Sequence, residues 1–133
     1  MKIADMEFLE PTLAGALAAA GVATTDDLLE RAGPAASRSA LAKATGIGAM
    51  ALRRHADLAD LMRLPKLTEG FALLLDALDL GSRERLKTAH APDLLRALRR
   101  KNVELTLVRA IHAESQLADW IEQAATEPSR VEH

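Results

Sequence analysis

Cysteine is absent from this chain of 133 residues, and aromatic side chains are scarce. Without cysteine there is no disulfide, no thiolate nucleophile and no cysteine-based zinc site, and the composition fits a reducing cytoplasm. Two Phe, one Trp and no Tyr are too few for the aromatic platforms on which single-stranded bases stack. There is no run of about eighteen apolar residues, and the first residues lack the apolar core of a signal peptide. We therefore predict a cytoplasmic protein with no membrane partner.

Sequence motifs of catalysis and metal binding are missing as well. The chain has no Gly-x-Ser-x-Gly elbow, no phosphate-binding loop and no dinucleotide-binding glycine pattern. No two histidines are four residues apart, as metal-binding pairs on a helix are; the histidines are His55, His90, His112 and His133. We therefore expect no enzyme activity, no cofactor and no metal.

The abundant residues favour helices. There are 27 Ala and 23 Leu but only four Ile and four Val, and unbranched side chains lose little freedom in a helix. Apolar residues recur at helical spacing in nine short segments: 11–21, 24–33, 37–46, 49–64, 68–81, 82–90, 92–101, 102–111 and 114–125. No alternating strand pattern is present. The sequence predicts an all-α fold of about eight to ten short helices.

Charge is unevenly distributed along the chain although the net charge is only −2. Residues 36–66 hold six basic residues against two acids, and residues 83–109 hold eight against three. Such segregation fits either a patch for an anionic partner or two solvated helix faces that pair with acidic neighbours. The sequence leaves both interpretations open.

The two halves of the chain resemble each other. Segments 16–32 and 73–89 superpose without gaps, each as an apolar helix, a tight turn and a short charged helix. Because short helix pairs rarely bury their apolar faces alone, we expect two repeat units, about 7–63 and 64–125, in one compact domain over 1–126. The polar residues 127–133 are expected to form a flexible tail.

The stretch Gly46-Ile47-Gly48 has the form of a helix-hairpin-helix turn. Glycine lets the backbone approach a phosphate without a Cβ in the way, and a helix N-terminus suits an anion. The turn therefore either binds phosphate or only reverses the chain between two helices. The basic residues that would assist phosphate binding are Arg53, Arg54, Arg96, Arg99, Arg100 and Lys101.

Three stretches of the chain are informative together: "AAAGVATTDDLLERA", "TGIGAMALRRHADLADLMRL" and "LADWIEQA". They resemble a known bacterial family, domain of unknown function 4332, and the likeness extends from about residue 7 to 125. The resemblance implies two tandem helix-hairpin-helix-like units. It implies no function, because members of the family have no assigned activity.

The sequence departs from the family pattern at a second hairpin. Where the family has glycine, a hydrophobic residue and glycine, this chain has Lys66, Leu67 and Thr68, and Asp79 replaces a glycine after the next helix. Leu67 keeps the hydrophobic anchor, but the loss of the glycines removes a backbone nest for an anion, and Glu69 adds a negative charge. We expect this second corner to be structural only.

Three consecutive leucines, Leu73, Leu74 and Leu75, cannot all face one core. Either a neighbouring helix of the same chain or a partner covers one of them, and Trp120 is open to the same two interpretations. We predict a non-catalytic helical adaptor that binds another protein or a second copy of itself. The alternative is weak, sequence-independent DNA binding through residues 46–48 and the basic helices.

Overall fold

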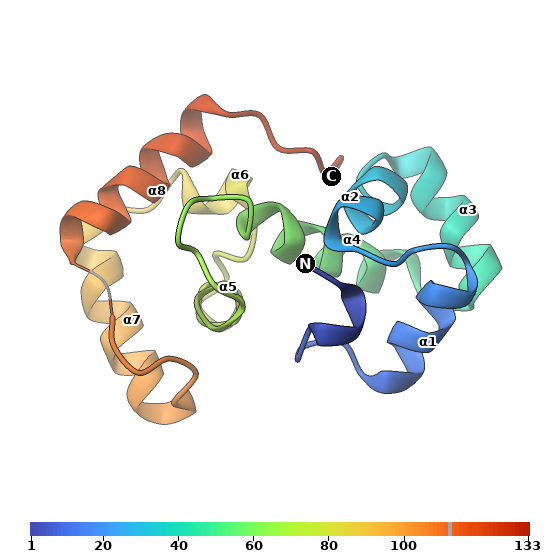
Figure 1. The fold of residues 1–133 in the computed structure, drawn as a ribbon. Coiled ribbons are helices and arrows are strands. Elements are labelled where there is room, and N and C mark those ends of the chain that lie inside the picture. The colour runs from blue at the N-terminus through green and yellow to red at the C-terminus, as the bar shows by residue number, and fades with distance from the viewer. Residues whose placement is uncertain (112) are drawn as a thin grey trace. The chain divides into compact units, whose positions relative to one another are not determined.

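The computed structural model describes residues 1–111 and 113–133, and these residues are mostly helical (Figure 1). They form eight α-helices and one 3-10 helix. The described residues contain no strand, and their single β-type contact is an isolated bridge between Lys2 and Thr24. The predicted all-α fold is confirmed. The chain divides into unit 1, residues 1–60 with 130–133, and unit 2, residues 61–129.

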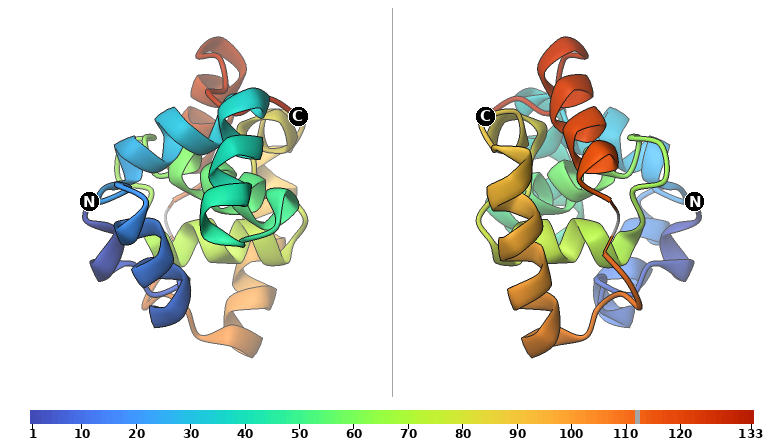
Figure 2. Two further views of the ribbon diagram at one scale, coloured as in Figure 1. Left: turned by 90° about the vertical axis from the view of Figure 1, so that its right-hand side faces the viewer. Right: turned by 90° about the vertical axis from the view of Figure 1, so that its left-hand side faces the viewer.

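Unit 1 contains the first four α-helices, preceded by the 3-10 helix η1. Their bounds are η1 Ile3–Asp5, α1 Pro11–Ala19, α2 Thr25–Ala32, α3 Ala35–Thr45 and α4 Ala49–Leu61, whose last residue lies across the division. Pro11 suits the first position of α1, where no backbone donor is needed. Thr24 and Asp27 form a capping box that begins α2. Helices α2 and α3 lie side by side (Figure 2).

Unit 2 contains the other four helices. They are α5 Glu69–Ala77, α6 Arg83–Leu86, α7 Ala91–Leu105 and α8 Glu114–Thr126. The hydroxyls of Thr68 and Ser82 accept backbone hydrogen bonds that begin α5 and α6. Helix α8 packs against both α6 and α7. The division between the units at residue 60 lies close to the boundary at 63 between the two predicted repeat units.

The turn after α1 and the turn after α5 have the same backbone hydrogen bonds. The Val22 N–H donates to the Leu17 carbonyl at 2.9 Å, and the Leu80 N–H donates to the Leu75 carbonyl at 2.8 Å. Both partners are shifted by 58 residues, whereas the ungapped superposition of 16–32 on 73–89 shifts them by 57. The two turns therefore correspond at a shift that differs by one residue from the shift of the ungapped superposition.

Each unit has an aliphatic core, as the abundance of leucine predicts. The fully buried side chains of unit 1 include Leu17, Val22, Leu28, Leu41 and Leu52, and those of unit 2 include Leu74, Leu75, Leu86, Leu98, Leu117 and Trp120. In unit 2 the Trp120 ring meets Phe71 edge-on at 5.3 Å, and its Nε1–H donates to the Pro65 carbonyl at 2.7 Å. Leucine on one face of each helix thus defines the core.

The predicted helix over 102–111 is wrong. Helix α7 continues without a break to Leu105, and the chain then leaves it through Thr106, which has a φ of +50°. The Thr106 N–H donates to the Asn102 carbonyl at 2.7 Å and ends the helix in a left-handed residue. Residues 106–111 are not helical. A helix end that needs positive φ is normally marked by glycine, and this one is not.

The end of the chain also differs from the expected flexible polar tail. Residues 130–133 belong to unit 1, and the side chain of Val131 is buried there. The Glu132 N–H donates to the Gly33 carbonyl at 2.9 Å, and the Arg38 guanidinium donates to the Glu132 carbonyl at 2.8 Å. One apolar residue and a set of main-chain hydrogen bonds hold a segment whose composition is polar.

Candidate functional site

The turn between α3 and α4 has the backbone geometry that its two glycines predict. Gly46 ends α3 with a φ of +75°, and its N–H donates to the Ala42 carbonyl at 2.9 Å. The Thr45 hydroxyl donates to the Leu41 carbonyl at 2.8 Å and accepts from the Ile47 N–H at 3.2 Å. Ile47 is buried and anchors the turn in unit 1. The loop is therefore fixed by its own hydrogen bonds and by one apolar side chain.

The second glycine occupies the N-cap position of α4. The Gly48 carbonyl accepts from the Leu52 N–H at 3.0 Å, and a Cβ built on Gly48 would have no atom within 4 Å. Residues 48–51 are exposed, so the first backbone N–H groups of this thirteen-residue helix face solvent. The positive end of the helix dipole is thus open to an anion.

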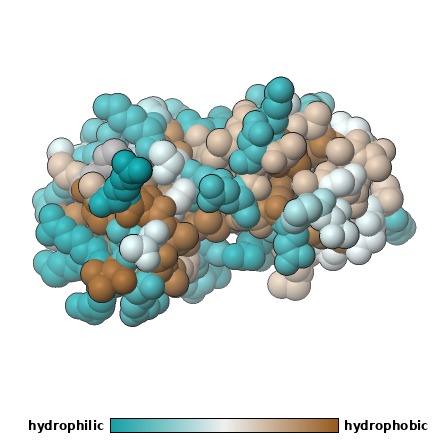
Figure 3. Space-filling view, turned by 60° about the horizontal axis from the view of Figure 1, so that its bottom comes forward, coloured by the Kyte–Doolittle hydropathy of each residue, from teal (hydrophilic) through white to brown (hydrophobic). Residues whose placement is uncertain are grey.

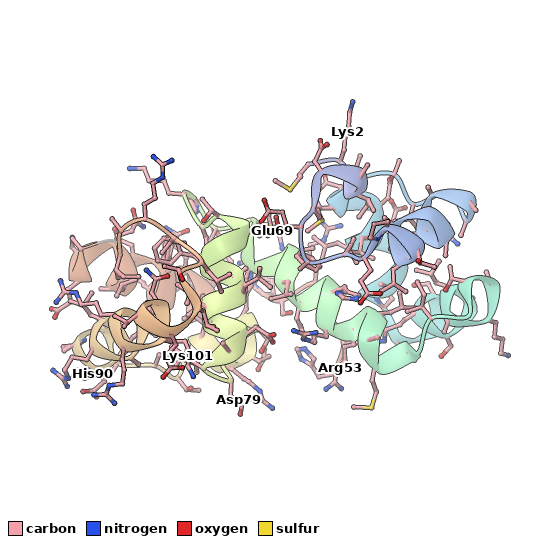
Figure 4. The ribbon with its side chains drawn as sticks, turned by 90° about the horizontal axis from the view of Figure 1, so that it is seen from below. Lys2, Arg53, Glu69, Asp79, His90 and Lys101 are labelled. Atoms are coloured by element: carbon pink, nitrogen blue, oxygen red, sulfur yellow. The ribbon has the colours of Figure 1, made fainter. Side chains whose placement is uncertain are left out.

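Basic side chains near this turn are few. Arg53 is half-buried and Arg54 is exposed, both on α4 (Figure 4). The other four predicted contacts, Arg96, Arg99, Arg100 and Lys101, lie on α7 in unit 2. Arg96 forms an ion pair with Asp93, and Lys101 lies 3.3 Å from Glu104. The structure thus places only two of the six basic residues on a helix that adjoins the turn.

The second corner keeps its shape without glycine. Lys66 has a φ of +67°, close to that of Gly46, and Leu67 is buried as Ile47 is. Thr68 occupies the N-cap position of α5, where its hydroxyl accepts from the Phe71 N–H at 3.4 Å. The threonine side chain therefore satisfies one of the helix-start donors that a phosphate would need. That the corner is structural only stays a prediction.

The side chains predicted as a partner surface are mostly interior. Leu74, Leu75 and Trp120 have no exposed area, and Leu73 is half-buried. Trp120 contacts Phe71 and Pro65 within unit 2. The prediction of a partner surface at these residues is therefore corrected, because packing within the chain already covers three of the four.

A different apolar surface is exposed on unit 2. Val103 is 83% exposed, Leu105 44% and Leu107 37%. We call residues 103–107, the last three residues of α7 and the two that follow it, the apolar turn. In the space-filling view, apolar side chains reach the surface among hydrophilic ones on the left, where unit 2 is drawn (Figure 3). Three apolar side chains are thus exposed to solvent within five consecutive residues.

The apolar turn is held in one conformation by Asn102. Its Oδ1 accepts from the N–H groups of Leu107 at 2.9 Å and Val108 at 3.1 Å, and its Nδ2 donates to the Val108 carbonyl at 2.9 Å. A Cβ on Gly70 would lie 2.6 Å from the Leu107 carbonyl oxygen. Because Gly70 has no Cβ, the chain that follows α7 can lie close to α5. Val103 and Leu105 are thus displayed by the last turn of α7, and Leu107 by a loop that Asn102 connects to it.

The histidines have separate surroundings. His55 stacks on Phe8 with a ring distance of 5.4 Å, His90 is exposed at the start of α7, and His112 lies outside the described residues. The His133 Nε2 is 2.8 Å from the Asp57 carboxylate. Burial raises the pKa of Asp57 above its usual value, and the hydrogen bond from His133 opposes that shift. In the described part of the chain, no three metal-ligating side chains come together.

These features define a class: an all-helical protein of two four-helix units, with one open glycine turn and one exposed apolar turn. A family model described as Domain of unknown function (DUF4332) matches residues 8–127. The chain belongs to this family. Searches of curated proteins and of solved structures give no match. None of the helices in the described residues is sufficiently long and apolar to cross a membrane.

Proposed function

We propose that this protein is a non-catalytic adaptor of the bacterial cytoplasm that binds another protein through the apolar turn of unit 2. The observation that carries the proposal is the exposure of Val103 and Leu105 at the end of α7 and of Leu107 in the following chain, which Asn102 holds in place. Apolar residues presented by a fixed part of the chain bind a partner with little ordering cost. The absence of cysteine supports the compartment.

Affinity capture from nuclease-treated lysate tests this proposal with a matched pair of variants. Val103→Asp places a charge in the apolar turn, whereas Met50→Asp places one at a residue of unit 1 that is 79% exposed. The proposal expects a partner that the wild type and Met50→Asp retain and Val103→Asp loses. A partner retained equally by both variants would exclude the apolar turn.

Sequence-independent DNA binding is the second candidate, and the open N-terminus of α4 favours it. The helix-start N–H groups with Arg53 and Arg54 are sufficient for about two to three phosphates, which gives a log–log salt dependence with a slope of roughly −2 to −3. We rank this function second because the net charge is −2 and the second corner caps its own helix.

Gly48→Asp separates DNA binding from folding. Gly48 has no positive φ and has open space around it, and aspartate is a favoured N-cap, so the fold should be retained. The carboxylate would occupy the place of a phosphate, whereas Gly48→Asn gives a similar cap without the charge. Fluorescence anisotropy with duplex DNA at about 150 mM salt is the measurement. Binding tighter than the roughly 10⁻⁴ to 10⁻⁶ M of ordinary non-specific complexes, lost in Gly48→Asp and kept in Gly48→Asn, would place DNA first.

A further inference from the structure

Residues 130–133, here called the C-terminal segment, make polar contacts with unit 1 at Arg130, Glu132 and His133. The residues of unit 1 that receive them form an acceptor site: Gly33, Ala35, Arg38, Asp57 and Asp60. Gly33 and Ala35 flank the corner between α2 and α3, Arg38 is on α3, and the two aspartates are on α4. The site therefore combines a helix corner, a buried cation and two carboxylates.

Main-chain groups carry much of the contact. The Glu132 N–H donates to the Gly33 carbonyl at 2.9 Å, and the Arg38 Nη2 donates to the Glu132 carbonyl at 2.8 Å. The buried Arg38 also donates to the carbonyls of Ala32 and Gly33 at 3.1 Å, which fixes its guanidinium. A Cβ on Gly33 would lie 2.2 Å from the Arg130 carbonyl oxygen, so glycine is required for this approach. Contacts of this kind recognise an extended segment irrespective of most of its side chains.

Side-chain contacts add selectivity at three consecutive positions. Val131 is buried, with 5% of its surface exposed. The Glu132 carboxylate accepts from the Ala35 N–H at 3.0 Å, at the start of α3, where Pro34 offers no side-chain cap. His133 lies against Asp57 at 2.8 Å. The site thus selects an aliphatic residue, then an acidic residue at a positive helix end, then a group that can pair with a carboxylate.

The segment is separate from the helical framework of unit 1. Residues 127–133 have no regular secondary structure, and residues 127 and 128, which lead into the segment, are exposed. Removing the segment from the acceptor site would therefore unwind no helix. We propose that the acceptor site is a peptide-recognition site that binds an extended protein segment in which an aliphatic residue is followed directly by an acidic one. The chain's own C-terminal segment covers this site, which is independent of the apolar turn.

The test uses the full chain and a fluorescent, C-terminally amidated peptide with the sequence of residues 128–133. A tethered segment competes at an effective concentration of about a millimolar, so the wild type should bind the peptide weakly. Val131→Asp removes the aliphatic anchor from the chain's own segment and should tighten peptide binding by at least about tenfold. Glu132→Lys should also tighten binding of the peptide, and it does so without changing a buried side chain. The control peptide carries Asp at the position of Val131 and should not bind.

Fluorescence anisotropy gives the dissociation constants, and circular dichroism gives the helix content of each variant. Tighter binding of the wild-type peptide alone, by both variants with helix content unchanged, supports the proposal. Equal binding of the two peptides, or no gain in either variant, overturns it. Loss of helix content in Val131→Asp also overturns it, because a segment that cannot leave without unfolding unit 1 is part of its core.

Discussion

Trp120 is the largest buried side chain and is the only tryptophan of the chain. Its ring packs edge-on against Phe71, and its indole N–H donates to the Pro65 carbonyl at 2.7 Å. A tryptophan with its polar atom satisfied gains the full benefit of burying a large ring. The ring therefore fixes α8 to the beginning of unit 2.

Trp120→Ala should lower the free energy of unfolding by about 3–5 kcal/mol, because it leaves a cavity and removes a hydrogen bond. Trp120→Phe keeps most of the apolar contact and should cost much less. Urea unfolding followed by circular dichroism measures both. A Trp120→Ala protein as stable as the wild type would mean that α8 does not depend on this contact.

The stability of unit 1 depends on pH through the buried Asp57. Its pKa is raised above 3.8 chiefly by burial, so the folded state holds the proton more tightly than the unfolded state does. Stability contributed by Asp57 therefore falls as the pH rises from 3.8 through the folded-state pKa. The contact with His133 limits this loss.

Replacing Asp57 by Asn removes the ionisation and should remove this dependence. The difference in melting temperature, Asp57→Asn minus wild type, should become more positive as the pH rises through that window. The same comparison made in a His133→Ala background should give a larger difference, because the Asp57 carboxylate then lacks the partner that opposes the rise of its pKa. Thermal melts across the acidic range supply the data. A difference that shrinks with rising pH would contradict the raised pKa.

At the scale of elements, the two helix corners test what glycine contributes. Gly46 and Lys66 both have positive φ, 75° and 67°, and both precede a buried apolar anchor. A Cβ on Gly46 would meet no atom within 4 Å, so a substitution there adds backbone strain without a clash. The two corners share a left-handed residue before a buried anchor, and they differ in that residue's type and in the following N-cap, Gly48 or Thr68.

Gly46→Lys should destabilise the protein by about 1–2 kcal/mol, because a left-handed conformation is costly for any residue with a Cβ. Lys66→Gly should stabilise it by up to about 1 kcal/mol, since the released strain exceeds the added flexibility of the unfolded chain. Chemical denaturation of the two variants gives both values. Equal effects of the same sign would show that the corners do not share this geometry.

Sequence reasoning succeeded for elements that carry local signals. The predicted segments 24–33 and 82–90 begin at Thr24 and Ser82, which cap α2 and α6, and the predicted segment 37–46 ends at Gly46, which ends α3 with positive φ. It failed at Thr106, because threonine rarely adopts positive φ and an apolar pattern continues past it. The prediction also missed the exposure of Val103, which lies near the end of α7, and of Leu107, which lies beyond it.

At the scale of the whole chain, the sequence predicts two similar halves, and the structure has two compact units of four helices each. Composition alone did not predict that residues 130–133 join unit 1, because their recognition depends on main-chain groups and a buried Arg38 far away in sequence. Nor did it predict the apolar turn as a candidate site, because the exposure of its side chains is a property of the folded structure.

The central claim is that the apolar turn of unit 2 contacts another protein. Site-specific photo-crosslinking in living cells tests it most directly, with a photoreactive amino acid at Val103 and, as control, at Met50. The two side chains are similarly exposed, at 83% and 79%, so a chance encounter should label both alike. The account predicts a discrete, nuclease-resistant protein adduct from position 103 and none from position 50. Equal labelling at both positions, or a nucleic-acid adduct from position 50 alone, would contradict it.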